Sequence, residues 1–170
     1  MPLLFFYSPN LNAVAEKPTQ QEKDFILELA KRYVHLDVLT YGQAERSVVR
    51  IDKRPNMYGG EGVVYLLHMF DRRELVNNRI GCYMILPAEG DESGFHTHGP
   101  RTEEELYVVM SGSGLYRERA GEAEDSPVRE KRLKPGMITA VKHDGFHAVR
   151  NTDPRHPLIL FVITTNEPES

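Results

Sequence analysis

Short apolar runs alternate with turn residues along most of the chain beyond residue 40. The connecting stretches are rich in Gly, Pro, Asn, Asp and Ser, which commonly separate β-strands. Many short strands at this spacing favour an all-β sandwich or barrel. The pattern predicts strands over residues 47–51, 63–70, 80–87, 104–110, 113–119, 128–133, 137–142, 147–151 and 157–165.

Residues 19–35 follow a helical periodicity instead. Thr19 and Glu22 fit a capping box, in which the hydroxyl bonds an amide of the first turn and the carboxylate reaches back. Apolar positions recur three and four residues apart, which predicts one buried stripe on a helix packed outside a sheet. The stripe consists of Phe25, Ile26, Leu29, Ala30 and Tyr33.

The length of 170 residues suggests one domain with a terminal extension. We expect an N-terminal extension with a strand and the helix over residues 1–45, and a β-barrel domain over residues 46–170. The apolar block at residues 3–6 lacks the length and basic flank of a signal peptide or membrane span. It is therefore expected to pair as a strand in its own sheet or a partner's, in a cytoplasmic protein that does not enter a membrane.

The composition argues against several classes of function and site. The net charge is −4, and no basic stripe stands out, which argues against a nucleic-acid partner. Cys82 is the only cysteine, so the chain has neither a disulfide framework nor a cluster of thiolate metal ligands.

Imidazoles and carboxylates gather around one predicted strand. His96 and His98 are separated by one residue, so on a strand both rings point the same way and can share one metal ion, each at about 2.1 Å. Glu103 and Glu105 also share a face with each other. A carboxylate that enters a barrel interior is costly unless a cation meets it. His147, after an Asp-Gly turn, offers a third imidazole.

These residues carry a resemblance to the cupin family. The first cupin motif is a glycine, five residues, His-x-His, a short gap, a glutamate, six residues and a glycine; the second is a glycine, a Pro-x-Gly turn, a histidine and an asparagine four residues later. The chain resembles both over residues 62–165, although Lys142 and Asp144 replace the Pro-x-Gly. The matching positions are Gly90, His96, His98, Glu105, Gly112, Gly136, His147 and Asn151.

The resemblance implies a double-stranded β-helix, the cupin jelly-roll barrel, with a metal ion held by His96, His98, His147 and one glutamate. Spacing to Gly112 favours Glu105 as the fourth ligand, whereas spacing from His98 favours Glu103. We expect Glu105, because the strand after the glutamate is more rigid than the loop before it. Glu103 is otherwise either solvated or turned inward as a general acid or base. Tyr107 shares a face with Glu105 and is expected either to fill the barrel or to border the same cavity. Candidate catalytic residues are therefore Glu103, Glu105 and Tyr107.

Three imidazoles and a carboxylate suit one divalent transition metal per chain, and these ligands do not discriminate among iron, manganese, nickel, zinc, cobalt and copper. The resemblance to cupin enzymes favours iron. Four ligands leave positions open for substrate or dioxygen. By resemblance we expect a dioxygenase-type oxidoreductase acting on a small organic molecule. A redox-neutral isomerase, lyase or cyclase and a non-catalytic ligand-binding cupin are the alternatives.

Other predictions concern single residues and assembly. His68 is expected to be a core histidine bonded to backbone, and His143 to be exposed. Arg117, Arg119 and Arg150 are expected to be solvated unless one turns inward toward an anionic substrate group. The resemblance to cupins of this size implies a homodimer that pairs sheet edges.

Overall fold

A computed structural model of the chain describes residues 15–39, 44–71, 74, 78–99, 103–121, 125–141 and 145–166. The elements in these ranges are α1 (Gln20–Lys31), β1 (Arg50–Pro55), the 3-10 turn η1 (Met57–Gly59), β2 (Val63–His68), β3 (Asn78–Leu86), β4 (Glu92–Thr97), β5 (Glu103–Ser111), β6 (Gly114–Arg119), β7 (Arg129–Leu133), β8 (Ile138–Val141), β9 (Phe146–Asn151) and β10 (Leu158–Asn166).

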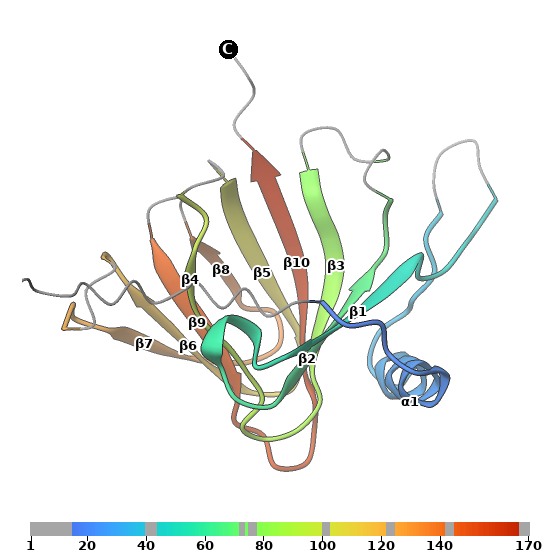
Figure 1. Ribbon diagram of the computed structural model, residues 1–170, viewed down its shortest axis with the longest axis horizontal. Coiled ribbons are helices and arrows are strands. Elements are labelled where there is room, and N and C mark those ends of the chain that lie inside the picture. Colours follow the sequence, from blue (N-terminus) through green and yellow to red (C-terminus); the bar gives the residue numbers. More distant parts are fainter. Residues whose placement is uncertain are drawn as a thin grey trace, which may run out of the picture.

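The strands form two antiparallel sheets. One has the order β1-β2-β3-β10-β5-β8 and the other the order β4-β9-β6-β7. The two sheets face each other across a barrel interior, and α1 lies outside, beside β1 (Figure 1). Strands that follow each other in sequence repeatedly change sheets, as in a jelly roll. The predicted fold class, an all-β jelly roll with one helix outside, is confirmed.

Alternation along β5 decides which side chains enter the barrel. Glu103, Glu105, Tyr107 and Val109 are buried, whereas Glu104 is exposed. The last two inward residues of that series join a core between the sheets, with partners such as Leu66 and Leu160. Side chains on a strand alternate between its two faces. The apolar residues toward the C-terminal end of β5 therefore fix the strand in the core, and its two buried glutamates point into the barrel at its N-terminal end.

All nine predicted strands overlap observed ones, although β1 begins at Arg50 rather than at residue 47. β4 was not among the predicted strands, because the glycine- and acid-rich residues around Gly90 and Gly94 are typical of a turn. At Gly112 the turn is a backbone requirement: φ is +80°, and an added Cβ would lie 2.3 Å from the Pro157 carbonyl oxygen.

The helix begins as predicted, but its buried stripe is shifted relative to the prediction. Thr19 Oγ1 accepts from the Glu22 amide at 3.2 Å, and Glu22 Oε2 accepts from the Thr19 amide at 2.8 Å. Ile26 and Ala30 are fully buried against the outer face of the large sheet, whereas Phe25 is 56% exposed. The buried stripe is therefore centred one residue further along the helix than predicted.

Several predictions fall outside the described residues: the strand at residues 3–6, His143, and the Lys142–Asp144 departure from the cupin motif. The division at residues 45 and 46 stays a prediction. Among the described residues, none of the helices has both the length and the apolar character needed to cross a membrane.

Candidate metal centre

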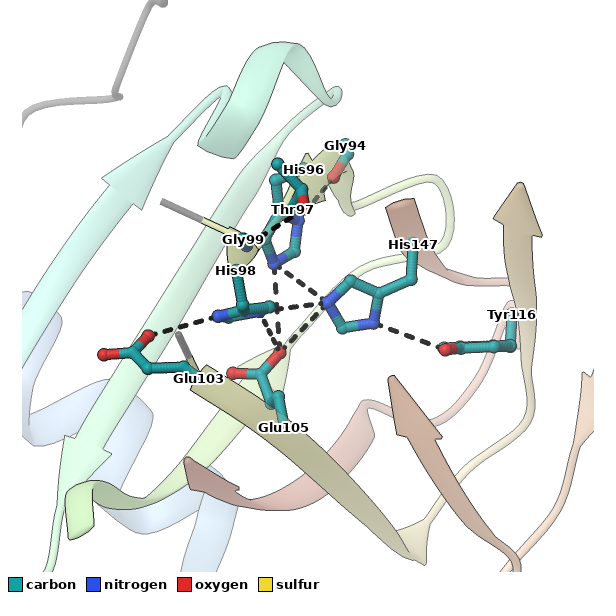
Figure 2. Close-up of polar contacts among 9 residues, drawn as sticks. All are labelled: Gly94, His96, Thr97, His98, Gly99, Glu103, Glu105, Tyr116 and His147. Atoms are coloured by element: carbon teal, nitrogen blue, oxygen red, sulfur yellow. Dashed lines mark hydrogen bonds and ion pairs between the residues drawn. The ribbon is translucent and has the colours of Figure 1, made fainter. Parts of the chain in front are cut away.

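Four side chains from both sheets meet inside the barrel near its mouth. His96 lies on β4 and His98 directly follows that strand, while His147 lies on the neighbouring β9. Glu105 comes from β5 in the opposite sheet. All four are buried, and each offers one ligand atom within 4.8 Å of the others (Figure 2). The structure thus brings together the three predicted histidines and selects Glu105 as the carboxylate.

The ligand atoms are spaced like adjacent ligands of one ion. His147 Nε2 lies 3.1 Å from His96 Nε2 and 3.3 Å from His98 Nε2. Glu105 Oε2 lies 3.1 Å from His147 Nε2, 3.2 Å from His98 Nε2 and 3.8 Å from His96 Nε2. Two ligands at about 2.1 Å from a six-coordinate ion are about 3.0 Å apart at adjacent positions. The geometry therefore fits a single transition-metal ion.

The outer nitrogens of the imidazoles have partners of their own. His96 Nδ1 donates to the Gly94 carbonyl oxygen at 2.9 Å, and His98 Nδ1 donates to Glu103 Oε2 at 3.3 Å. The Tyr116 hydroxyl lies 3.4 Å from His147 Nδ1. Carbonyl and carboxylate oxygens only accept, so on the neutral rings of His96 and His98 the Nε2 lone pairs face the centre.

Metal binding requires a neutral imidazole and an ionised carboxylate, and the pKa shifts of His147 and Glu105 favour these forms. Burial lowers the pKa of His147 to about 4, so this imidazole is neutral near pH 7. Burial raises the pKa of Glu105, but in the metal-free site hydrogen bonds from His147, His96 and His98 outweigh burial and hold that pKa well below the usual value. Those bonds need protons on Nε2, which a bound metal ion would displace. Imidazole lone pairs and a carboxylate at this distance repel one another unless a cation lies between them. The donor set therefore fits a divalent ion.

Glu103 lies next to the four-residue group but is not part of it. It is buried rather than solvated, and its carboxylate contacts the outer nitrogen of His98. This arrangement of carboxylate, histidine and central site is typical of residues that orient a metal-binding imidazole. Its predicted role in catalysis stays a prediction.

Tyr107 borders the centre as expected from its face on β5. Its ring stacks on His147, with ring centroids 5.2 Å apart. Two buried hydroxyl oxygens lie near Glu105: that of Thr164 has no hydrogen-bond partner among the described residues, and that of Tyr107 interacts with the Glu105 carboxylate. Thr164 on β10 is the cross-strand partner of Glu105, so its side chain enters the barrel beside that carboxylate. Burial raises the pKa of Tyr107 well above its usual value, and the negative charge of Glu105 raises it further.

Sequence reasoning missed four residues of this region: Tyr58, Gly94, Tyr116 and Thr164. The alternation along 113–119 and 157–165 could have placed Tyr116 and Thr164 on inward faces. Nothing in the sequence indicated Tyr58, whose ring stacks on His96, because it lies in a glycine-rich stretch typical of a turn.

The remaining candidates lie elsewhere. Arg117 pairs with Glu92, and Arg119 covers the ring of Phe95, both on the outer face of the small sheet. These arginines do not turn inward. His68 is buried as predicted, but its described partner is a side chain rather than backbone: its Nε2 lies 3.0 Å from Asp52 Oδ2.

Comparison with known proteins supports the fold. No protein-family model matches the chain, and no curated protein matches it in sequence. A protein from Thermotoga maritima described as a predicted oxalate decarboxylase is 21% identical, with a TM-score of 0.59 over 69% of this chain and 92% of that one. The cupin domain of Schizosaccharomyces pombe Cnp3 is 11% identical, with a TM-score of 0.51 over 79% of this chain and 87% of that one.

The iron(II) form of HppE is 14% identical, with a TM-score of 0.51 over 75% of this chain and 63% of that chain. At these identities the likeness concerns the fold. The structural matches agree with the two facing antiparallel sheets and the inward histidines, and all three indicate the same fold. The chain has the cupin fold, with a buried group of three histidines and one glutamate that can bind one metal ion.

Proposed function

We propose that the protein is a metal-dependent enzyme of the dioxygenase type that acts on a small organic molecule bearing hydroxyl or carboxyl groups, with iron(II) as its metal. The convergence of three imidazole nitrogens and one Glu105 oxygen within 4.8 Å carries this proposal. Three neutral ligands and one carboxylate leave a divalent ion with net positive charge, and on a six-coordinate ion they leave two positions open. A structural zinc site would instead be tetrahedral and closed by four protein ligands.

Different residues of the chain have different roles at the proposed metal site. His96, His98, His147 and Glu105 hold the ion. When bound, the ion supplies Lewis acidity toward substrate oxygens, and iron(II) also supplies an electron for oxygen chemistry. Glu103 keeps the His98 ring in place through its outer nitrogen. The buried walls exclude water from a small substrate.

Two buried hydroxyls beside Glu105 favour an oxygen-containing substrate. A buried hydroxyl without a partner is costly, so native structures rarely keep one without a reason. The Thr164 hydroxyl has no partner among the described residues, and the described partner of the Tyr107 hydroxyl is the Glu105 carboxylate. Each can donate a hydrogen bond to a substrate oxygen beside the metal site and thereby orient it.

The donor set also favours a redox-neutral alternative, because these four ligands suit zinc as well as iron. In that case the enzyme is an isomerase, lyase or cyclase that uses the ion only as a Lewis acid. Both kinds of chemistry are compatible with structures that share the fold, since one is an iron(II) protein and another is described as a predicted decarboxylase.

An aerobic and anaerobic assay separates the candidates. Metal-free protein is loaded separately with iron(II), manganese, nickel, cobalt, copper or zinc and offered a panel of small hydroxy and carboxylic acids. We expect turnover and oxygen consumption with iron only in air. Turnover without oxygen, or full activity with zinc, overturns the dioxygenase proposal in favour of the redox-neutral one. A ligand that binds without turnover under any metal indicates a binding protein.

Assembly is a separate proposal. We propose a homodimer in which sheet edges pair, with a small-molecule substrate as the other partner. Light scattering during size-exclusion chromatography measures the mass, and a chain that lacks residues 1–10 tests whether the apolar N-terminal block contributes. A monomeric full-length chain excludes the dimer.

A further inference from the structure

The segment between β1 and β2 places an aromatic ring on one metal-site histidine. Tyr58 in η1 stacks on His96, with ring centroids 4.0 Å apart and an angle of 14° between the rings. The Tyr58 backbone is left-handed, with φ 52° and ψ 34°, and Asn56 has φ 48°. A left-handed backbone is unfavourable for residues with a Cβ, and it is particularly uncommon for a bulky residue such as tyrosine.

Close backbone contacts keep this segment in place. An added Cβ at Gly94 would lie 2.3 Å from the Tyr58 carbonyl oxygen, and one at Gly60 would lie 2.3 Å from the Glu92 carbonyl oxygen. The Glu92 amide donates to the Glu61 carbonyl at 2.8 Å. The loop is thus pressed against β4 at distances that only glycine permits. A strained residue persists where its surroundings fix it, and such residues cluster at functional sites.

The same contacts fix His96 on two sides. Its outer nitrogen donates to the Gly94 carbonyl at 2.9 Å, and its ring face is covered by Tyr58. Gly94 in turn touches the Tyr58 backbone. A hydrogen bond through Nδ1 sets the tautomer but still allows the imidazole to tilt about that bond. A flat ring packed against the imidazole removes the tilt.

We propose that Tyr58 is a positioning residue: its ring holds the His96 imidazole in the orientation that directs Nε2 to the metal site, and its left-handed backbone is retained for this purpose. The inference rests on the proposed metal site but not on any particular reaction. Tyr58 acts through His96. The glycine-rich stretch 59–62, which reads as an ordinary turn, serves to deliver this ring.

A purely structural role makes a different prediction. If Tyr58 only packed the loop onto the barrel, its replacement would lower the thermal stability of the metal-free protein. The folded molecules would then bind metal as well as wild type. Metal affinity, measured well below the unfolding midpoint of each variant, therefore separates the two roles.

Four variants test the idea, with cobalt(II) titrated into metal-free protein and its visible absorption spectrum recorded. Tyr58→Phe keeps the ring and is expected to bind cobalt as wild type does. Tyr58→Leu keeps an apolar side chain without a flat ring. Tyr58→Gly removes both ring and backbone strain. Both are expected to lose about tenfold in affinity, the range found for residues that orient a metal ligand, and to show an altered spectrum.

Asn56→Gly is the matched control, because it relieves a left-handed backbone in the same segment without touching His96. It is expected to leave cobalt affinity unchanged. Wild-type affinity and spectrum in Tyr58→Leu and Tyr58→Gly would overturn the positioning role. Failure of wild-type protein to bind cobalt at all would instead refute the metal site, which distinguishes failure of the inference from failure of the proposed function.

Discussion

His96 and His147 are cross-strand partners in the antiparallel register of β4 and β9, and their Nε2 atoms lie 3.1 Å apart. They are 51 positions apart in sequence, yet the register of two short strands sets the distance between their side chains. Facing residues on neighbouring strands have Cβ atoms about 5 Å apart, so two imidazoles that lean together can share one ion. His98 and Glu105 lie close enough to complete the donor set in the observed backbone conformation.

Loss of one of these rings should empty the site. His147→Ala is expected to lower metal affinity by more than about 100-fold, a larger effect than that of residues which only orient ligands. Elemental analysis after purification without added metal measures the bound ion. His156→Ala is the matched control, because His156 is a half-exposed histidine that contacts Asp153. Metal retained at the wild-type ratio in His147→Ala would refute the ligand assignment.

Glu103 should affect metal binding without being a ligand. Glu103→Gln keeps the shape of the side chain but weakens the charge-assisted bond to His98 Nδ1, so we expect metal affinity to fall by about 10-fold to 100-fold. Competition with a chelator measures this affinity. Glu104→Gln, on the exposed face of the same strand, should leave it unchanged. Equal affinities in the two variants would remove the orienting role.

Helix α1 should be held to the barrel less firmly in acid. The pKa of Glu22 is lowered from 4.5 to about 2 by a hydrogen bond from Lys53, whose Nζ lies 2.6 Å away, and by bonds with Thr19. The folded pKa lies below the unfolded value, so the stabilisation is present above pH 4.5 and is lost as pH falls through about 2.

The unfolding midpoints of metal-free wild type and Glu22→Gln should therefore differ most near neutral pH and converge toward pH 2. Glu28→Gln serves as a control, since Glu28 pairs with Lys31 within the helix and on its exposed side. A wild-type advantage that stays constant from pH 6 down to pH 2 would contradict the linkage.

The contact between η1 and β4 should be intolerant of even one methyl group. Gly94→Ala would place a Cβ 2.3 Å from the Tyr58 carbonyl oxygen and 2.7 Å from the Gly60 amide nitrogen, so backbone must move. We expect a loss of about 2–4 kcal/mol in the free energy of unfolding, as for other overpacked sites. Urea denaturation of the metal-free protein measures it.

Gly121→Ala is the comparison for that experiment, because among the described residues its added Cβ would meet just the Ser126 hydroxyl, at 3.3 Å. Its free energy of unfolding should stay within about 0.5 kcal/mol of wild type. Similar stabilities of the two variants would show that the loop adapts easily to the extra methyl group.

The local chemistry of the chain determined several features by itself. Thr19 and Glu22 specify the start of α1, because a capping box depends on residues three positions apart. Alternation along β5 placed Glu103, Glu105 and Tyr107 on one face, since the side-chain period of a strand is fixed by backbone geometry. The pair at positions 96 and 98 indicated a shared site for the same reason.

Only the tertiary structure decided which of these side chains meet. Glu103 and Glu105 share a face, so the period of two could not choose between them; the position of β5 across from β4 and β9 brings Glu105 to the centre and leaves Glu103 behind His98. Tyr58 reaches His96 through a backbone contact between Gly94 and η1. Periodicity reports the face on which a side chain lies, whereas its neighbours depend on register and packing between segments far apart in sequence.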